Sequence, residues 1–135
     1  MNTEKLTTKS RDAVTAAVRQ ALTNGNPNAE PEHLLHGLLM VPDNTVGPLL
    51  ESMGINPAAI DERAEAEIAK LPTTSGSSVT QPALSGALAR VMASAETLAD
   101  ELGDQFVATE HLLIGLVRIT SPAQQILIDA GVTED

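Results

Sequence analysis

The sequence predicts an all-α fold: two tandem copies of one small helical unit, related by a pseudo-twofold axis and packed as one small globular domain of about 7–8 helices. Two observations support this prediction. A seven-residue segment recurs almost unchanged 78 residues later, and apolar residues recur at the three- and four-residue spacing of amphipathic helices. With 135 residues, 42% of them hydrophobic, the chain has enough apolar material for one shared core.

The repeat is clearest around two histidines. Residues 32–38 read Glu-His-Leu-Leu-His-Gly-Leu, and residues 110–116 read Glu-His-Leu-Leu-Ile-Gly-Leu, so six of seven positions are identical. The offset, 111 − 33 = 78, also relates Gly25 to Gly103. Agreement at one offset over distant positions indicates a duplicated structural unit.

The first helix of each copy carries an alanine-rich apolar stripe. In the first copy this stripe runs up to Gly25, which can end the helix, and it consists of Ala13, Val14, Ala17, Val18, Ala21 and Leu22. In the second copy the helix extends from about Ser85 to Leu102, and Gly103 supplies the left-handed residue that closes a helix. Its stripe consists of Leu88, Val91, Met92, Ala95, Leu98, Ala99 and Leu102.

The second helix of each copy begins near Glu32 and near Glu110. Four apolar residues face one way in each, namely Leu34, Leu35, Leu38 and Leu39 in the first copy and Leu112, Leu113, Leu116 and Val117 in the second. Pro31 suits the opening turn of a helix, and Thr109 is the residue we expect as the N-cap in the second copy.

The remaining helices are shorter. A third helix is expected before Gly54 in the first copy and between Pro122 and Gly131 in the second. The first copy adds a fourth helix, which begins at Asn56-Pro57 and stops at Pro72. The second copy has no such helix, because the chain ends at Asp135 where it would begin. We therefore expect an excised piece of a longer chain or a short standalone homologue.

A polar segment separates the two copies. Residues 72–82 are rich in Ser, Thr and Gly and have proline at both ends, which is typical of a linker. The expected organisation is a first copy at residues 1–71, this linker, and a second copy at residues 83–135 that lacks its final helix.

Composition excludes several classes of partner. Eighteen acidic against eight basic residues give a net charge of −10, which repels nucleic acids and anionic membranes, so we expect neither as a partner. Phe106 is the only aromatic residue, so no platform for stacking bases can form. The start of the chain lacks a secretory signal, cysteine is absent, and no apolar stretch is long enough to span a membrane. We expect a cytoplasmic protein.

No catalytic or metal-binding pattern stands out. The chain lacks both the Gly-x-Ser-x-Gly elbow and the P-loop sequence that binds nucleotide phosphates, and neighbouring acids such as Asp61-Glu62 point to different faces of a helix. His33, His36 and His111 fall in two different copies with no cysteine to complete a zinc site. We expect no enzyme activity, no cofactor and no metal.

The repeated Glu-His-Leu-Leu-x-Gly-Leu motif, with the alanine-rich helix before it, resembles the Clp N-terminal repeat from Leu6 to Val132. Three segments are more similar to the ClpB subfamily than to ClpC or ClpA: residues 6–9 (Leu-Thr-Thr-Lys), Leu71-Pro72 with the linker that follows, and residues 103–107 (Gly-Asp-Gln-Phe-Val).

The resemblance implies an accessory domain on a hexameric AAA+ disaggregase that works with the DnaK system. Such a domain captures unfolded or aggregated client proteins for threading by the ATPase ring. The alternatives are a ClpC- or ClpA-type domain that docks adaptors for a Clp protease, and a standalone repeat protein.

The family also implies three substrate-binding residues, which match Thr7, Asp104 and Glu110 here, beside a hydrophobic groove. Each of them has a purely structural interpretation as well. Thr7 could be only a helix N-cap, Asp104 a turn residue, and Glu110 an acid stabilised by the dipole of a helix start.

Overall fold

The computed structural model describes residues 3–74 and 82–132, and within them it is helical, as the sequence predicts. The first copy contains a 3₁₀-helix η1 (Thr3–Lys5) and the helices α1 (Thr8–Thr23), α2 (Pro31–Met40), α3 (Val46–Ser52) and α4 (Pro57–Ala69). The second copy contains α5 (Gly86–Glu101), α6 (Thr109–Arg118) and α7 (Pro122–Asp129). Residues 75–81 of the predicted linker and residues 133–135 lie outside the described part of the chain.

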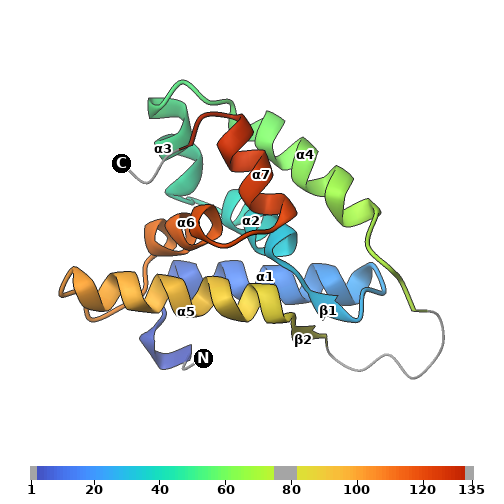
Figure 1. Ribbon diagram of the computed structural model, residues 1–135, viewed down its shortest axis with the longest axis horizontal. Coiled ribbons are helices and arrows are strands. Elements are labelled where there is room, and N and C mark those ends of the chain that lie inside the picture. Colours follow the sequence, from blue (N-terminus) through green and yellow to red (C-terminus); the bar gives the residue numbers. More distant parts are fainter. Residues whose placement is uncertain (1–2, 75–81, 133–135) are drawn as a thin grey trace.

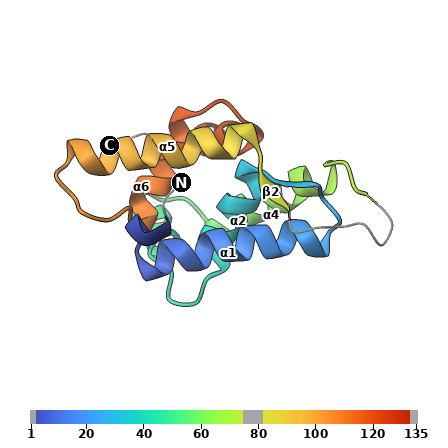
Figure 2. The ribbon, with the colours of Figure 1, turned by 90° about the horizontal axis from the view of Figure 1, so that it is seen from below.

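The helices form two outer groups with a central pair between them. α1 and α5 run in opposite directions along one face, and α3, α4 and α7 lie toward the opposite face (Figures 1 and 2). α2 and α6 lie between them: α2 packs against α1 and α4, and α6 packs against α5 and α7. The core is therefore shared by both copies and is centred on the leucines of α2 and α6, of which Leu34, Leu35, Leu38, Leu112, Leu113 and Leu116 are all buried.

Two short backbone pairings relate the copies by a pseudo-twofold axis. Strand β1 (Asn28–Ala29) pairs in parallel with β2 (Ala83–Leu84), and Ala29 lies opposite Leu84. A second parallel bridge joins Val107 to Leu6. The offset of 78 converts one pairing into the other, since 29 + 78 = 107 and 84 − 78 = 6. Each copy thus pairs the segment before its second helix with the segment before the other copy's first helix.

A glycine sets the close approach of the first two helices in each copy. A Cβ atom added at Gly37 of α2 would lie 2.5 Å from the carbonyl oxygen of Ala13 in α1. At the equivalent Gly115 it would lie 2.8 Å from the carbonyl oxygen of Val91 in α5. Both distances are far below van der Waals contact, so only glycine fits at these crossings.

The alanine-rich stripes are narrower than the sequence predicts. Ala13, Ala17 and Ala21 are fully buried, but Leu22 is 43% exposed. In α5 the last predicted member of the stripe, Leu102, is 63% exposed, because it is the C-cap and lies past the end of the helix face that packs on the core.

Candidate functional site

The three residues that the family resemblance singles out lie around one end of the domain. The backbone N–H of Thr7 donates to the carbonyl oxygen of Val107 over 3.1 Å, and the N–H of Val107 donates to the carbonyl oxygen of Lys5 over 2.7 Å. Val107 stands three residues after Asp104 and three before Glu110. The start of α1 is therefore tied to the middle of the segment that carries both acids.

Thr7 is the N-cap of α1. Its hydroxyl oxygen accepts the Ser10 N–H over 3.1 Å, and the hydroxyl proton is donated to Ser10 Oγ over 2.9 Å. Ser85 caps α5 in the same way, by accepting the Leu88 N–H over 3.0 Å. The hydroxyl of Thr7 is thus engaged in a structural contact that is present in both copies.

Asp104 follows the end of α5 and is held by a histidine. Gly103 has a φ of +77°, and the Asp104 N–H then donates to the carbonyl oxygen of Ala99 over 2.8 Å. The Asp104 carboxylate accepts a hydrogen bond from Nε2 of His111 over 2.9 Å. Because Nδ1 of His111 accepts the Ala108 N–H over 2.8 Å, the proton of the neutral ring must be on Nε2. The Asp104 side chain remains 50% exposed.

The prediction that Thr109 is the N-cap of α6 is wrong. The N-cap is Ala108, whose side chain can accept nothing, and the imidazole of His111 satisfies the Ala108 N–H instead. Thr109 is the first residue of the helix, and its hydroxyl lies 2.6 Å from that of Thr45, the N-cap of α3.

Glu110 joins the two copies at the surface. Its Oε1 lies 2.7 Å from Thr45 Oγ1 and 2.9 Å from Thr109 Oγ1. Together with the contact between the two threonine hydroxyls, this makes three short contacts among three oxygen atoms. Each threonine hydroxyl has one proton to donate, so two of the three contacts are hydrogen bonds at any moment. Glu110 itself is exposed, which leaves much of its carboxylate open to solvent.

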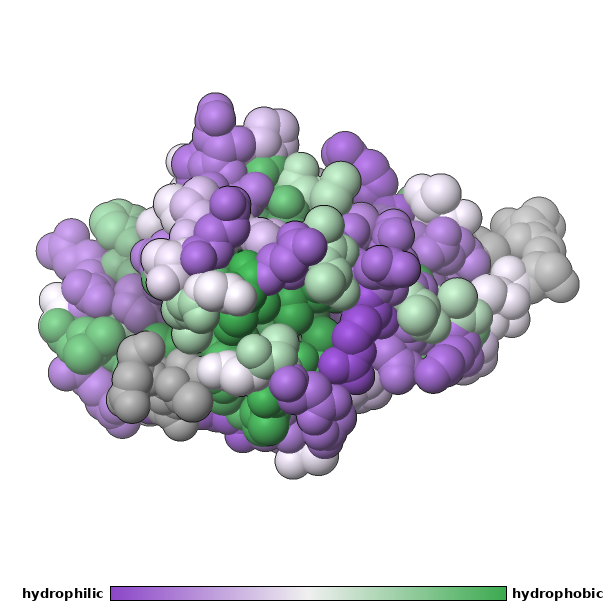
Figure 3. Space-filling view, turned by 90° about the horizontal axis from the view of Figure 1, so that it is seen from above, coloured by the Kyte–Doolittle hydropathy of each residue, from purple (hydrophilic) through white to green (hydrophobic). Residues whose placement is uncertain are grey.

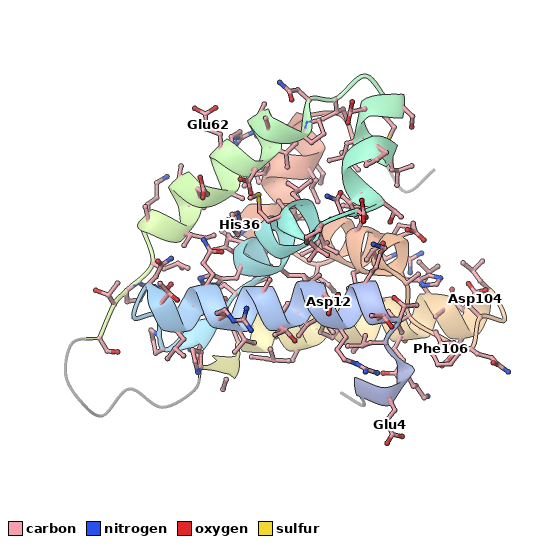
Figure 4. The ribbon with its side chains drawn as sticks, turned by 180° about the vertical axis from the view of Figure 1, so that it is seen from behind. Glu4, Asp12, His36, Glu62, Asp104 and Phe106 are labelled. Atoms are coloured by element: carbon pink, nitrogen blue, oxygen red, sulfur yellow. The ribbon has the colours of Figure 1, made fainter. Side chains whose placement is uncertain are left out.

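Exposed apolar side chains adjoin both acids. Leu102 and Phe106, two residues on either side of Asp104, are 63% and 51% exposed. Asp104 and Phe106 project at the same end of the molecule (Figure 4). We call Thr7, Leu102, Asp104, Phe106 and Glu110 the candidate surface.

On α3, Leu49 and Met53 follow Thr45 at four-residue spacing, so they continue along the helix face that meets Glu110. They are 38% and 37% exposed. The face that carries α3, α4 and α7 has an apolar central hollow ringed by polar side chains (Figure 3).

The first copy has a different set of residues at the equivalent positions. Leu102, Asp104 and Phe106 correspond, at the offset of 78, to Asn24, Asn26 and Asn28. Asn26 is only 2% exposed, because it contacts Nε2 of His33 at 3.0 Å and donates to the carbonyl oxygen of Pro72 over 3.0 Å. The Thr74 N–H also donates to the carbonyl oxygen of Gly25 over 2.7 Å. The segment after α4 thus covers this loop.

Glu32 and His33 are correspondingly buried, whereas Glu110 is exposed. Glu32 is 2% exposed, and burial, assisted by the charges of Glu30 and Glu67, raises its pKa above the usual value. His33 is fully buried; burial, with a smaller contribution from His36, lowers its pKa to about 4. The motif's glutamate is therefore buried in the first copy and exposed in the second, while its histidine and leucines are buried in both.

Comparison with protein families gives the identity of the unit. The model of the Clp repeat (R) N-terminal domain matches residues 5–130. The chain belongs to the Clp repeat N-terminal domain family. Curated relatives include the chaperone protein ClpB of Propionibacterium freudenreichii subsp. shermanii, 66% identical over 133 residues, and that of Corynebacterium diphtheriae, 38% identical over 129 residues. The matches cover 98% and 96% of the chain but 15% of each relative, so the chain is similar to the N-terminal region of ClpB.

Solved structures of Clp N-terminal domains share the fold. The Hsp104 N-terminal domain from Candida albicans superposes with a TM-score of 0.83 at 19% identity, covering 97% of this chain and 85% of that one. A ClpV N-domain solved in complex with VipB peptide gives a TM-score of 0.73 at 25% identity, covering 97% and 81%. Within the described residues, no helix is long and apolar enough to cross a membrane.

Proposed function

We propose that the chain is the client-binding N-terminal domain of a cytoplasmic ClpB-like AAA+ disaggregase. In this proposal the candidate surface holds unfolded or aggregated polypeptide, which the ATPase modules of a hexameric parent then thread in collaboration with the DnaK system. The observation that carries the proposal is the contrast between the copies. Exposed Leu102, Asp104 and Phe106 occupy positions where the first copy has three asparagines, one of them buried under the chain.

The chemistry of the candidate surface suits unfolded polypeptide. Apolar side chains with an acidic border can hold apolar and basic segments without strong sequence preference, and such side chains are what an unfolded client exposes. The ClpV N-domain, which has the same fold, is solved with a bound peptide, and this supports the proposal. Because one shallow surface must offset the ordering of the client, we expect affinity of about micromolar Kd or weaker.

Binding measurements on single variants test this proposal. Fluorescence anisotropy would follow a labelled, permanently unfolded protein, such as reduced α-lactalbumin, as the chain is added. Phe106→Ser should weaken binding at least about fivefold, by removing the largest exposed apolar side chain of the surface. Asp104→Asn should weaken it less, because the amide oxygen still accepts from His111.

The matched control is Leu22→Ser, which removes an apolar side chain of similar exposure, 43%, at the far end of α1 from Thr7. It should leave client affinity unchanged. Equal losses in Leu22→Ser and Phe106→Ser would reject the site, and absence of binding to any unfolded protein would reject client binding itself. Selective binding of one folded adaptor would instead favour a ClpC- or ClpA-type docking domain.

A further inference from the structure

A second polar cluster lies in the first copy, away from the candidate surface. His36 of α2 contacts Asp61 of α4 with its Nδ1 2.6 Å from Asp61 Oδ1, and the same Nδ1 is 4.0 Å from Oε1 of Glu65. One ligand atom from each of the three residues lies within 4.8 Å of the others. The side chains of His36 and Asp61 are only 15% and 18% exposed, so solvent reaches the cluster mainly past Glu65.

The two helices hold these groups in place. Asp61 and Glu65 are four residues apart on α4, which puts both carboxylates on one face of the helix. The buried Ile60, Ala64 and Ile68 fix α4 on the core beside them. His36 comes from the middle of α2, whose leucines are buried. The donor set is therefore carried by rigid elements and not by a loop.

The spacing suits a divalent transition metal. Four-coordinate zinc, with bonds of about 2.0–2.1 Å to nitrogen and oxygen, places its ligand atoms about 3.4 Å apart. The separations of 2.6 and 4.0 Å lie on either side of that value, and small χ rotations at Asp61 and Glu65 would equalise them. One imidazole with two carboxylates is a set that Zn²⁺ and Co²⁺ accept, whereas Mg²⁺ and Ca²⁺ prefer oxygen alone.

A buried carboxylate lies one helical turn from His36. Glu32 lies one helical turn before His36 on the same face of α2, and it is 2% exposed. Its Oε1 has no hydrogen-bond partner within the described residues. Burial raises the pKa of the Glu32 carboxyl, and a cation bound at His36 would favour its ionised form.

We propose that His36, Asp61 and Glu65 form a binding site for one divalent transition-metal ion, with Zn²⁺ as the physiological class, which clamps α4 to α2. The site belongs to the first copy alone, because the position equivalent to His36 is Ile114. In the metal-free chain the Nδ1–H of His36 donates to the Asp61 carboxylate. A metal ion would bind the lone pair of an unprotonated Nδ1, so in the metal-bound chain the proton of the neutral ring lies on Nε2. The sequence did not indicate this site, since Asp61 and Glu65 are more than twenty residues from His36.

Isothermal titration of the untagged chain with ZnCl₂ tests the proposal. We expect one ion per chain with a Kd of about micromolar and a rise in Tm of a few degrees at saturating zinc. His36→Gln and Asp61→Asn should each weaken binding at least about tenfold. The matched control is Glu62→Gln, which removes a carboxylate from the exposed outer side of α4 (Figure 4) and should stay within about twofold of wild type.

Cobalt gives a second readout that surface carboxylates cannot produce. Co²⁺ held by an imidazole and two carboxylates should show visible d–d absorption that His36→Gln abolishes and that excess Mg²⁺ leaves in place. Thermal melts without metal show which variants are folded. Either His36→Gln or Asp61→Asn, if folded, is sufficient to test the site. Zinc affinity that is unchanged in a folded His36→Gln or Asp61→Asn variant, or no binding up to about 1 mM zinc, would overturn the proposal.

Discussion

The two copies of the repeat share one skeleton but differ in how its loops are covered. Both have a histidine that accepts the N-cap N–H of the second helix and contacts a side chain seven residues earlier. In the first copy that partner is Asn26, buried under Pro72, and in the second it is the half-exposed Asp104. The comparison teaches that the duplicated leucines, histidines and helix-crossing glycines build the core, while the loop before the second helix has diverged in sequence and in how far its histidine partner is covered.

The largest expected effect is on the shared core, where the copies should behave alike. Leu35 and Leu113 are 0% and 3% exposed at equivalent positions. Leu35→Asp and Leu113→Asp should each abolish the folded state, because a buried, unpaired carboxylate costs several kcal/mol, which approaches the whole stability of a small domain. Circular dichroism melts measure this. A cooperative transition near that of wild type for either variant would show that the copies do not share a core.

The helix crossings should show a graded difference. Gly37→Ala and Gly115→Ala should each cost about 1–3 kcal/mol, with Gly37→Ala near the upper end, because its Cβ would meet a backbone oxygen at 2.5 Å instead of 2.8 Å. Urea denaturation measures the loss. Gly86→Ala is the control: its Cβ would meet only the end of the Arg90 side chain at 3.6 Å, so it should be neutral or slightly stabilising.

Exchanging the histidine partners should be costly in one direction only. Asn26→Asp replaces the amide that donates to Pro72 with a buried carboxylate facing a carbonyl oxygen, and should cost about 2 kcal/mol. Asp104→Asn keeps an oxygen for His111 and should change stability by less than about 0.5 kcal/mol. Equal losses in urea denaturation would mean that the two loops are equally covered.

Acid should destabilise the domain through His33. Its folded pKa is about 4 against 6.5 for the free side chain, so the unfolded chain takes up a proton first as pH falls. The free energy of unfolding should therefore drop by about 2 kcal/mol from pH 7 to pH 5 through this group. Glu32 acts in the opposite direction, since its raised pKa makes the folded chain take up a proton first above pH 4.5.

The variant His33→Gln isolates the histidine contribution, because it keeps Glu32. Between pH 7 and pH 5 the unfolding free energy of the variant should fall less than that of the wild type. The difference between the two falls should be about 2 kcal/mol, which is the His33 contribution. Urea titrations at the two pH values give both differences. An identical pH dependence in the two proteins would mean that His33 is not the group responsible.

Much of the fold could be predicted from the sequence, because apolar spacing, prolines and glycines act locally. The ends of α1, α2 and α4 follow from Gly25, Pro31 and Asn56-Pro57 in this way. The paired segments β1 and β2 could not be predicted, since two-residue strands have no periodicity and depend on the pseudo-twofold packing.

The site was predicted less completely than the fold. The family resemblance supplied Thr7, Asp104 and Glu110, but not Leu102 and Phe106, and Leu102 was wrongly assigned to the core stripe of its helix. A signal did exist in the sequence: aligning the copies at the offset of 78 sets Leu, Asp and Phe against three asparagines. The cover that Pro72 and Thr74 place over the first loop could not be inferred, because it arises from a contact between residues more than forty positions apart.

The most direct test of functional divergence between the copies is NMR mapping of client binding. An ¹⁵N-labelled chain titrated with an unlabelled unfolded protein contains its own control, since each position of the candidate surface has a counterpart in the first copy. The account predicts chemical-shift changes at Asp104, Phe106 and Glu110 and none at Asn26, Asn28 and Glu32. Changes of equal size in both sets, or changes confined to the first copy, would contradict it.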